Sequence, residues 1–110
     1  MTTTLGTLEL AALLAVARLG EEAYGLAVRQ DLSDRADRDY SVGAIYTTLT
    51  RLETKGLLTS KASKPLPVRG GRSRRLFRVT GAGARAIRDA EQQATAMWAG
   101  MRSTLRTRPT

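Results

Sequence analysis

The most informative part of the sequence runs from Ser41 to Val79 and reads SVGAIYTTLTRLETKGLLTSKASKPLPVRGGRSRRLFRV. It predicts a helix that Ser41 caps and Gly56 ends, since Ser is a favoured N-cap and Gly a favoured left-handed stop. A strand beginning at Leu57, a basic Gly-rich loop and a second strand from Leu76 to Val79 should follow. Helix, strand, basic loop and strand is the order of a recognition helix and its wing. We therefore expect a winged helix-turn-helix that binds DNA.

Val42, Ile45, Leu49 and Leu52 fall on one face of this helix and should be buried. The opposite face is small and hydroxylic, which suits a helix that enters a major groove about 12 Å wide. An ordinary amphipathic helix would more often carry several Glu and Lys residues there, so the basic hairpin that follows favours the DNA-binding interpretation. The residues expected to face bases or phosphates from this helix are Ser41, Tyr46, Thr47, Thr50 and Arg51.

Positive charge is concentrated in the second part of the chain. Residues 1–60 hold six Lys and Arg against eight Asp and Glu, whereas residues 61–110 hold twelve against two, for a net charge of +8. Residues 61–78 contain seven basic residues and no acid. A solvated loop would tolerate this cluster, but a phosphate partner explains single-sign charge between two strands better. The wing residues expected to contact phosphates or the minor groove are Lys64, Arg69, Arg72 and Arg74.

Two core helices should precede this stretch, because apolar residues recur at helical spacing from Leu5 to Leu19 and from Tyr24 to about Leu32. Leu26, Val28 and Leu32 are available for burial in the second helix. In the second strand, Phe77 and Val79 share a face that should point to the core. The expected fold class is mainly α with a small two-stranded β wing.

A last helix should run from about Gly81 to about Leu105, capped by Thr80. At about 35 Å it is longer than a small domain can cover alone, so its apolar stripe predicts a dimer. The alternative is a helix that folds back on its own domain. The expected organisation is a DNA-binding domain over 1–80 and a dimerisation helix with a frayed tail over 81–110. The expected interface residues are Ile87, Ala90, Ala94, Met97, Met101 and Leu105.

Composition argues against an enzyme. The chain has no cysteine and no histidine, which removes disulfides, thiolate chemistry, the commonest general base and the usual metal ligand. We expect neither a metal nor a cofactor. The apolar segment from Leu5 to Leu19 is interrupted by Glu9 and Arg18 and is too short to span a membrane. A cytoplasmic protein without membrane contact is therefore expected.

The chain resembles the PadR family of bacterial transcriptional regulators along most of its length. Four segments in this order and spacing carry the resemblance: Leu5–Leu14, Ala23–Leu26, Gly43–Leu57 and Gly71–Gly83. A single C-terminal helix resembles the short subclass. The chain departs from the family where Thr47 follows Tyr46, a position at which the family often has Pro, and where Leu76 and Phe77 replace paired tyrosines. The resemblance implies a homodimer that reads an inverted repeat in double-stranded DNA, usually as a repressor.

The resemblance also implies release from DNA by a small-molecule or other signal. Some short members bind drugs between paired tryptophans on the last helix, so a small aromatic or cationic effector is expected at Trp98, with Met97 and Met101 beside it. Packing of Trp98 in the dimer core is the alternative. Two other functions compete with the repressor. One is a protein-interaction adaptor that uses a winged-helix dimer without specific DNA binding. The other, an RNA-binding protein, fits the charge but not the lack of stacking aromatics in the basic region.

Overall fold

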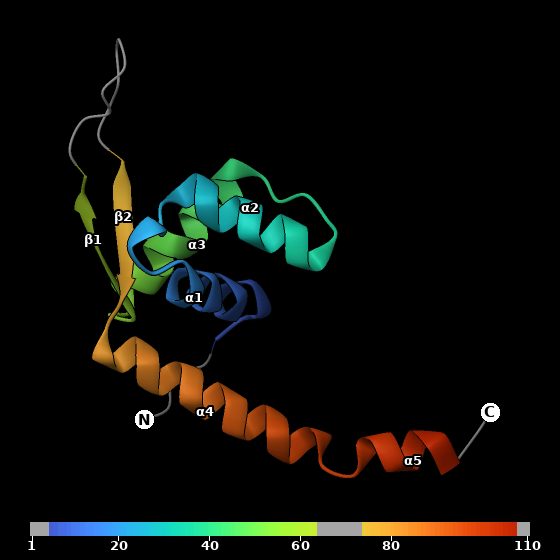
Figure 1. Cartoon of the computed structure of the whole chain (residues 1–110). Helices are drawn as coiled ribbons and strands as arrows, with labels where there is room; N and C mark the ends of the chain where they lie inside the picture. Colours follow the sequence, from blue (N-terminus) through green and yellow to red (C-terminus); the bar gives the residue numbers. More distant parts are fainter. Residues whose placement is uncertain (1–4, 64–73, 108–110) are drawn as a thin grey trace.

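The structure, a computed structural model, describes residues 5–63 and 74–107 of the 110-residue chain. Helices α1 to α3 lie together beside a two-stranded hairpin, α4 runs beneath them, and α5 extends away from the rest (Figure 1). The elements are α1 (Thr7–Leu19), the 3₁₀ turn η1 (Gly20–Glu22), α2 (Gly25–Ala36), α3 (Val42–Thr54), β1 (Leu58–Ala62), β2 (Arg75–Val79), α4 (Gly81–Trp98) and α5 (Met101–Thr107). The predicted fold class is confirmed.

The core lies between the first three helices and the sheet. Its largest fully buried side chains come from α1, α2 and α3: Leu13, Val16, Val28, Ile45, Leu49 and Leu52. Phe77 closes it from β2 and is 3% exposed. Helix α2 reaches Ala36, four residues beyond the predicted end, and Leu26 is exposed although we expected it to be available for burial. The apolar residues that do pack, Val28 and Leu32, are one helical turn apart on the inner face.

Helix α3 begins and ends where the sequence predicts. The Ser41 hydroxyl accepts a hydrogen bond from the Ala44 N–H at 3.0 Å, which satisfies a donor that the first turn leaves unpaired. Gly56 has a φ of 79°, in the left-handed region that favours glycine. Val42 is exposed, contrary to its expected burial, because it stands in the first turn, beyond the edge of the core.

The hairpin is attached to the helical part of the fold along one edge of β2. β1 and β2 pair antiparallel, with Leu58 opposite Val79 and Ser60 opposite Phe77. On the other edge of β2, the Phe77 N–H donates to the Ala23 carbonyl at 2.8 Å, and Tyr24 forms a bridge with Leu76. The sheet is therefore attached through β2 to the start of α2.

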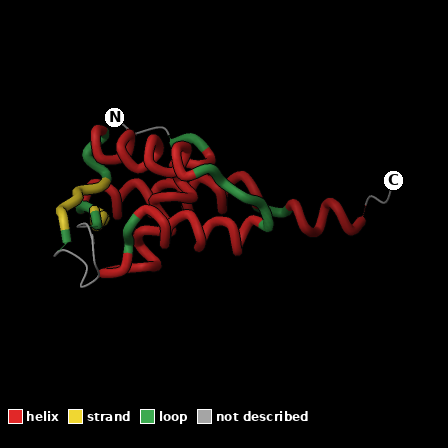
Figure 2. Tube along the Cα trace, turned by 90° about the horizontal axis from the view of Figure 1, so that it is seen from above, coloured by secondary structure: helices red, strands yellow, loops and turns green. Residues whose placement is uncertain are grey.

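The last helix is not continuous. We expected one helix from about Gly81 to about Leu105, but Ala99 is extended (φ −54°, ψ 125°) and Gly100 has a φ of 75°, so the chain bends between α4 and α5. Figure 2 shows α5 at the end of the molecule opposite the strands. Across residues 5–63 and 74–107, no helix combines the length and apolar character that a membrane span requires.

Candidate nucleic-acid interface

Helix α3 has one buried face and one exposed face. Ile45, Leu49 and Leu52 are fully buried, and Thr48 is buried with its hydroxyl donating to the Ala44 carbonyl at 2.7 Å. The predicted base-reading residues occupy the exposed face: Tyr46, Thr47, Thr50 and Arg51. Ser41 is exposed at the helix start. The structure thus brings the five predicted residues of α3 and its cap to an accessible surface.

Tyr46 differs from its neighbours because its ring contacts another helix. It is 40% exposed, yet a Cβ atom built on Gly25 would fall 2.4 Å from its Cζ and 2.5 Å from its hydroxyl oxygen. The ring therefore lies across the start of α2, where only a glycine leaves enough space. One edge of α3 is held against α2 by this contact.

Two groups of charged residues hold α1 against its neighbours. Glu9 accepts from the Gly6 N–H at 2.9 Å and pairs with Lys55 at the end of α3, with 2.8 Å between Lys55 Nζ and Glu9 Oε2. The backbone hydrogen bond from Gly6 and the Lys55 ammonium keep the pKa of Glu9 below its usual range. Asp31 on α2 pairs with Arg18 on α1 and with Arg35, and these hydrogen bonds lower the pKa of its carboxyl.

The base of the wing carries a second aromatic contact. The Arg74 Cζ atom lies 4.2 Å from the centroid of the Tyr24 ring, and Arg74 is exposed. Its backbone pairs with Ser63: the Arg74 N–H donates to Ser63 Oγ at 2.8 Å, and the Ser63 N–H donates to the Arg74 carbonyl at 2.6 Å. Of the predicted wing residues, Lys64, Arg69 and Arg72 lie outside the described residues, so Arg74 is the one whose surroundings are known.

Tyr24 and Gly25 are the site residues that sequence reasoning missed. Both belong to a segment that carried the family resemblance, but no role was assigned to them. A glycine directly after an aromatic residue at a predicted helix start was the available signal. Tyr24 contacts Arg74, and Gly25 contacts Tyr46. Both partners are distant in the sequence, so periodicity could not reveal either contact.

The predicted dimer residues divide between two environments. Ile87 packs partly against the chain's own core, and Ala90 is half-buried. The remaining predicted residues are exposed: Ala94, Met97, Met101 and Leu105. Met97 is 80% exposed, Trp98 67% and Leu105 66%. These exposed apolar side chains stand at the end of α4 and, beyond the bend, on α5.

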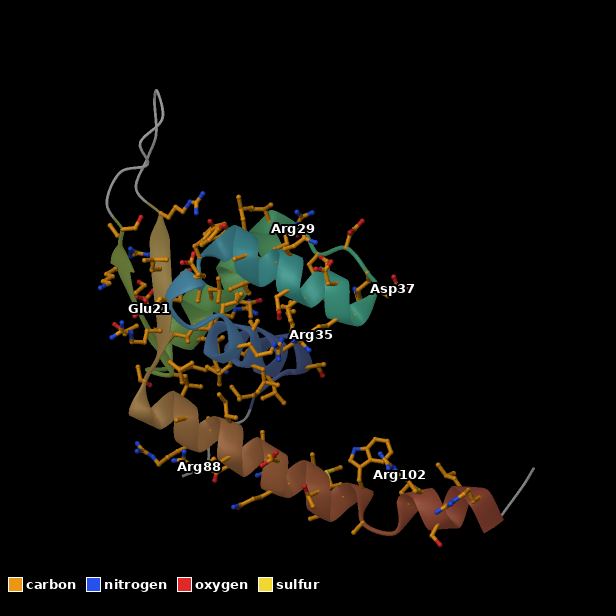
Figure 3. The ribbon with its side chains drawn as sticks, in the orientation of Figure 1. Glu21, Arg29, Arg35, Asp37, Arg88 and Arg102 are labelled. Atoms are coloured by element: carbon orange, nitrogen blue, oxygen red, sulfur yellow. The ribbon has the colours of Figure 1, made fainter. Side chains whose placement is uncertain are left out.

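An open hollow of about 630 Å³ lies at the bend between α4 and α5, beside Trp98. Gly100, Arg102, Ser103 and Arg106 complete its lining, and Figure 3 labels Arg102 on α5. Two guanidinium groups therefore stand near the indole. Within the described residues, no group of three His, Cys, Asp or Glu is placed to hold a metal ion.

Comparisons with known proteins agree in family and fold. The model of the transcriptional regulator PadR-like family matches residues 13–89. A PadR family transcriptional regulator from Eggerthella lenta is 30% identical, with a TM-score of 0.68 over 92% of this chain and 89% of that one. A PadR-like transcription factor from Bacteroides fragilis is 27% identical, with a TM-score of 0.65 over 93% and 89%. A comparison with curated protein sequences finds no match.

Proposed function

Because this chain belongs to the PadR-like family of transcriptional regulators, we propose that it acts as a homodimeric repressor that binds an inverted repeat in double-stranded DNA. The main support for this function is the exposure of four polar side chains on one face of α3: Tyr46, Thr47, Thr50 and Arg51. A strongly basic hairpin follows this helix in the sequence. A helix with small polar side chains and one Arg fits the major groove, where Arg pairs with guanine through two hydrogen bonds.

The exposed face of α3 and the wing make different kinds of contact with DNA in this proposal. Residues of α3 read bases, and Ser41 lies near a phosphate at the start of that helix. The wing residues Lys64, Arg69, Arg72 and Arg74 contact phosphates or the minor groove. Their role follows from the absence of acids between residues 61 and 78, because a cluster of one sign attracts the DNA backbone.

Dimerisation is assigned to the C-terminal segment, residues 81–110, and DNA binding to residues 1–80. The exposed apolar side chains of Met97, Trp98 and Leu105 support this division, since burying large exposed apolar groups favours association. Ala90 and Ala94 are small enough to let two such helices approach closely. Helix α1 is proposed as a second contributor.

A small aromatic effector is proposed at Trp98, with Met97 and Met101 as adaptable neighbours. Its binding would tilt the C-terminal helices and change the spacing of the two recognition helices. Arg102 and Arg106 line the hollow beside Trp98, at the bend between α4 and α5. Like-charge repulsion from these two guanidinium groups disfavours a cationic compound there. We therefore assign the site to a neutral or anionic planar aromatic compound rather than to a cationic one.

Selection of bound duplexes from a random DNA pool tests the proposal. The expected product is an inverted repeat whose half-sites lie about one helical turn, roughly 34 Å, apart. Arg51→Ala should relax the selected sequence, whereas Arg88→Ala, which removes an exposed arginine from α4 (Figure 3), should leave it unchanged. Failure to enrich any sequence would contradict specific DNA binding and leave the adaptor function in its place.

A further inference from the structure

The contact between Arg74 and Tyr24 joins the wing to the helical domain. Its separation of 4.2 Å, from Cζ to ring centroid, is well within the range at which a guanidinium is attracted to an aromatic face. Arg74 stands at the base of the wing, next to β2, and Tyr24 immediately precedes α2. The pair therefore links the wing, whose strand β1 packs against α3, to α2, which also packs against α3.

Both partners have a fixed backbone. Tyr24 is held to β2 by its bridge with Leu76, supported by the hydrogen bond between the Phe77 N–H and the Ala23 carbonyl. Arg74 is held by its two hydrogen bonds with Ser63. With the backbones fixed, the remaining freedom belongs to the long Arg74 side chain, and the Tyr24 ring restricts it.

Stacking leaves a guanidinium able to bind an anion. Its N–H groups lie in its own plane, so a ring beneath the flat face does not occupy them. An ordered Arg also loses less conformational entropy when it binds a phosphate than a freely rotating one does. The ring thus prepares Arg74 for a hydrogen-bonded phosphate contact.

The position of the Arg74–Tyr24 pair relative to α3 is consistent with a phosphate contact by Arg74. Gly25, the residue after Tyr24, lies beneath the ring of Tyr46, which belongs to the exposed face of α3. A continuous series of residues therefore leads from Arg74 to the Tyr24 ring and, through the backbone of the adjacent Gly25, to the ring of Tyr46. A DNA backbone that borders the groove occupied by α3 would pass next to the base of the wing.

We propose that Tyr24 is a positioning residue that holds Arg74 ready to bind a DNA phosphate at the junction of the wing and α2. The inference rests on the proposed DNA-binding function and adds a residue to it that carries no charge. The Tyr24 ring, not its hydroxyl, is the part that contacts Arg74. Removal of the hydroxyl therefore separates this positioning role from a direct hydrogen bond between Tyr24 and a phosphate.

Four variants measured by fluorescence anisotropy on a labelled duplex at several salt concentrations test the proposal. Arg74→Gln should weaken binding and lower the salt slope by about one. Tyr24→Leu should weaken binding about two- to tenfold, the range expected from loss of a cation–π contact. Tyr24→Phe keeps the ring and should bind like the wild type. In the double variant, Tyr24→Leu should add nothing to the loss caused by Arg74→Gln.

Additive losses in the double variant, or a Tyr24→Phe variant as weak as Tyr24→Leu, would overturn the proposal. Arg74→Lys provides a test that does not disturb Tyr24. Lysine keeps the charge but has no flat group to stack, so the salt slope should stay and the affinity should fall. Wild-type affinity in Arg74→Lys would also overturn the proposal. If the wild type binds no duplex at all, the DNA-binding function itself fails, which is a distinct result.

Discussion

The ring of Tyr46 lies against the backbone of Gly25, so closely that a Cβ atom on Gly25 would stand 2.4 Å from Tyr46 Cζ. This contact joins the exposed face of α3 to the start of α2. It places an aromatic side chain in a defined orientation at the surface that we assign to the major groove. The same contact gives a simple way to disturb that orientation without touching α3.

Gly25→Ala should displace the Tyr46 ring outward. Since the ring end is partly exposed and able to move, we expect a small change in stability but a clear loss of DNA affinity. In a Tyr46→Ala background, Gly25→Ala should cause little further loss, because the clashing ring is absent. Anisotropy titrations of the two single variants and the double variant measure this coupling, and equal losses in both backgrounds would refute it. Gly81→Ala, which lies in α4 and whose Cβ would meet Arg85 Nη1 at an ordinary 3.8 Å, is the control.

Gly83→Ala should destabilise the fold. Gly83 is buried at the start of α4, and its added Cβ would lie 2.2 Å from the Leu57 carbonyl oxygen, a backbone atom that cannot move alone. We expect a loss of about 1–3 kcal/mol in the free energy of unfolding, typical of overpacking. Gly81→Ala, whose Cβ would meet Arg85 Nη1 at 3.8 Å, should be neutral or slightly stabilising. Urea unfolding compares them, and equal stabilities would contradict the close packing.

The stability of the fold should decrease in acid. The pKa of Glu9 is lowered by the Gly6 N–H and by Lys55, so the unfolded chain binds a proton more readily than the folded one. The stabilisation is present above the ordinary pKa of 4.5 and is lost as pH falls below it. Glu9→Gln should have a shallower dependence of Tm between about pH 6 and about pH 3. Glu91→Gln, on the exposed part of α4, should keep the wild-type dependence. Identical pH profiles for Glu9→Gln and the wild type would exclude this contribution.

Charge on one face of α4 should disrupt the dimer. Ala94→Glu places a carboxylate on the face that carries Met97 and Trp98, where two-fold symmetry would bring two like charges together. Ala96→Glu makes the same change about 160° around the helix, from the 100° turn per residue, and should leave the dimer intact. Light scattering at micromolar concentration distinguishes them. A monomeric wild type would contradict dimerisation through this helix.

Local signals in the sequence predicted much of the fold. Ser41 and Thr80 cap their helices as expected, with side-chain oxygens that accept from the Ala44 and Gly83 N–H groups. Phe77 is buried as the alternation of β2 predicts. These features depend on residues within a few positions of one another, so the sequence contains all the information they need.

The features that were missed depend on distant partners or on a balance of local preferences. The Tyr24–Arg74 and Gly25–Tyr46 contacts require the start of α2 to meet the wing and α3, which no spacing rule encodes. The bend at Ala99 and Gly100 interrupts a stripe that is periodic across it. A glycine within a helical pattern costs about 0.5–1 kcal/mol relative to alanine, so the pattern alone could not decide between a continuous and a bent helix.

In the proposed function, the exposed face of α3 reads DNA sequence. Fluorescence anisotropy of the wild type and of Arg51→Ala, on the selected inverted repeat and on a scrambled duplex of equal length, separates sequence reading from general attraction to DNA. The wild type should prefer the selected duplex by about a thousandfold or more. Arg51→Ala should lose about 1–3 kcal/mol on that duplex and much less on the scrambled one. Equal affinity of the wild type for both duplexes, or equal losses on both in Arg51→Ala, would contradict the claim.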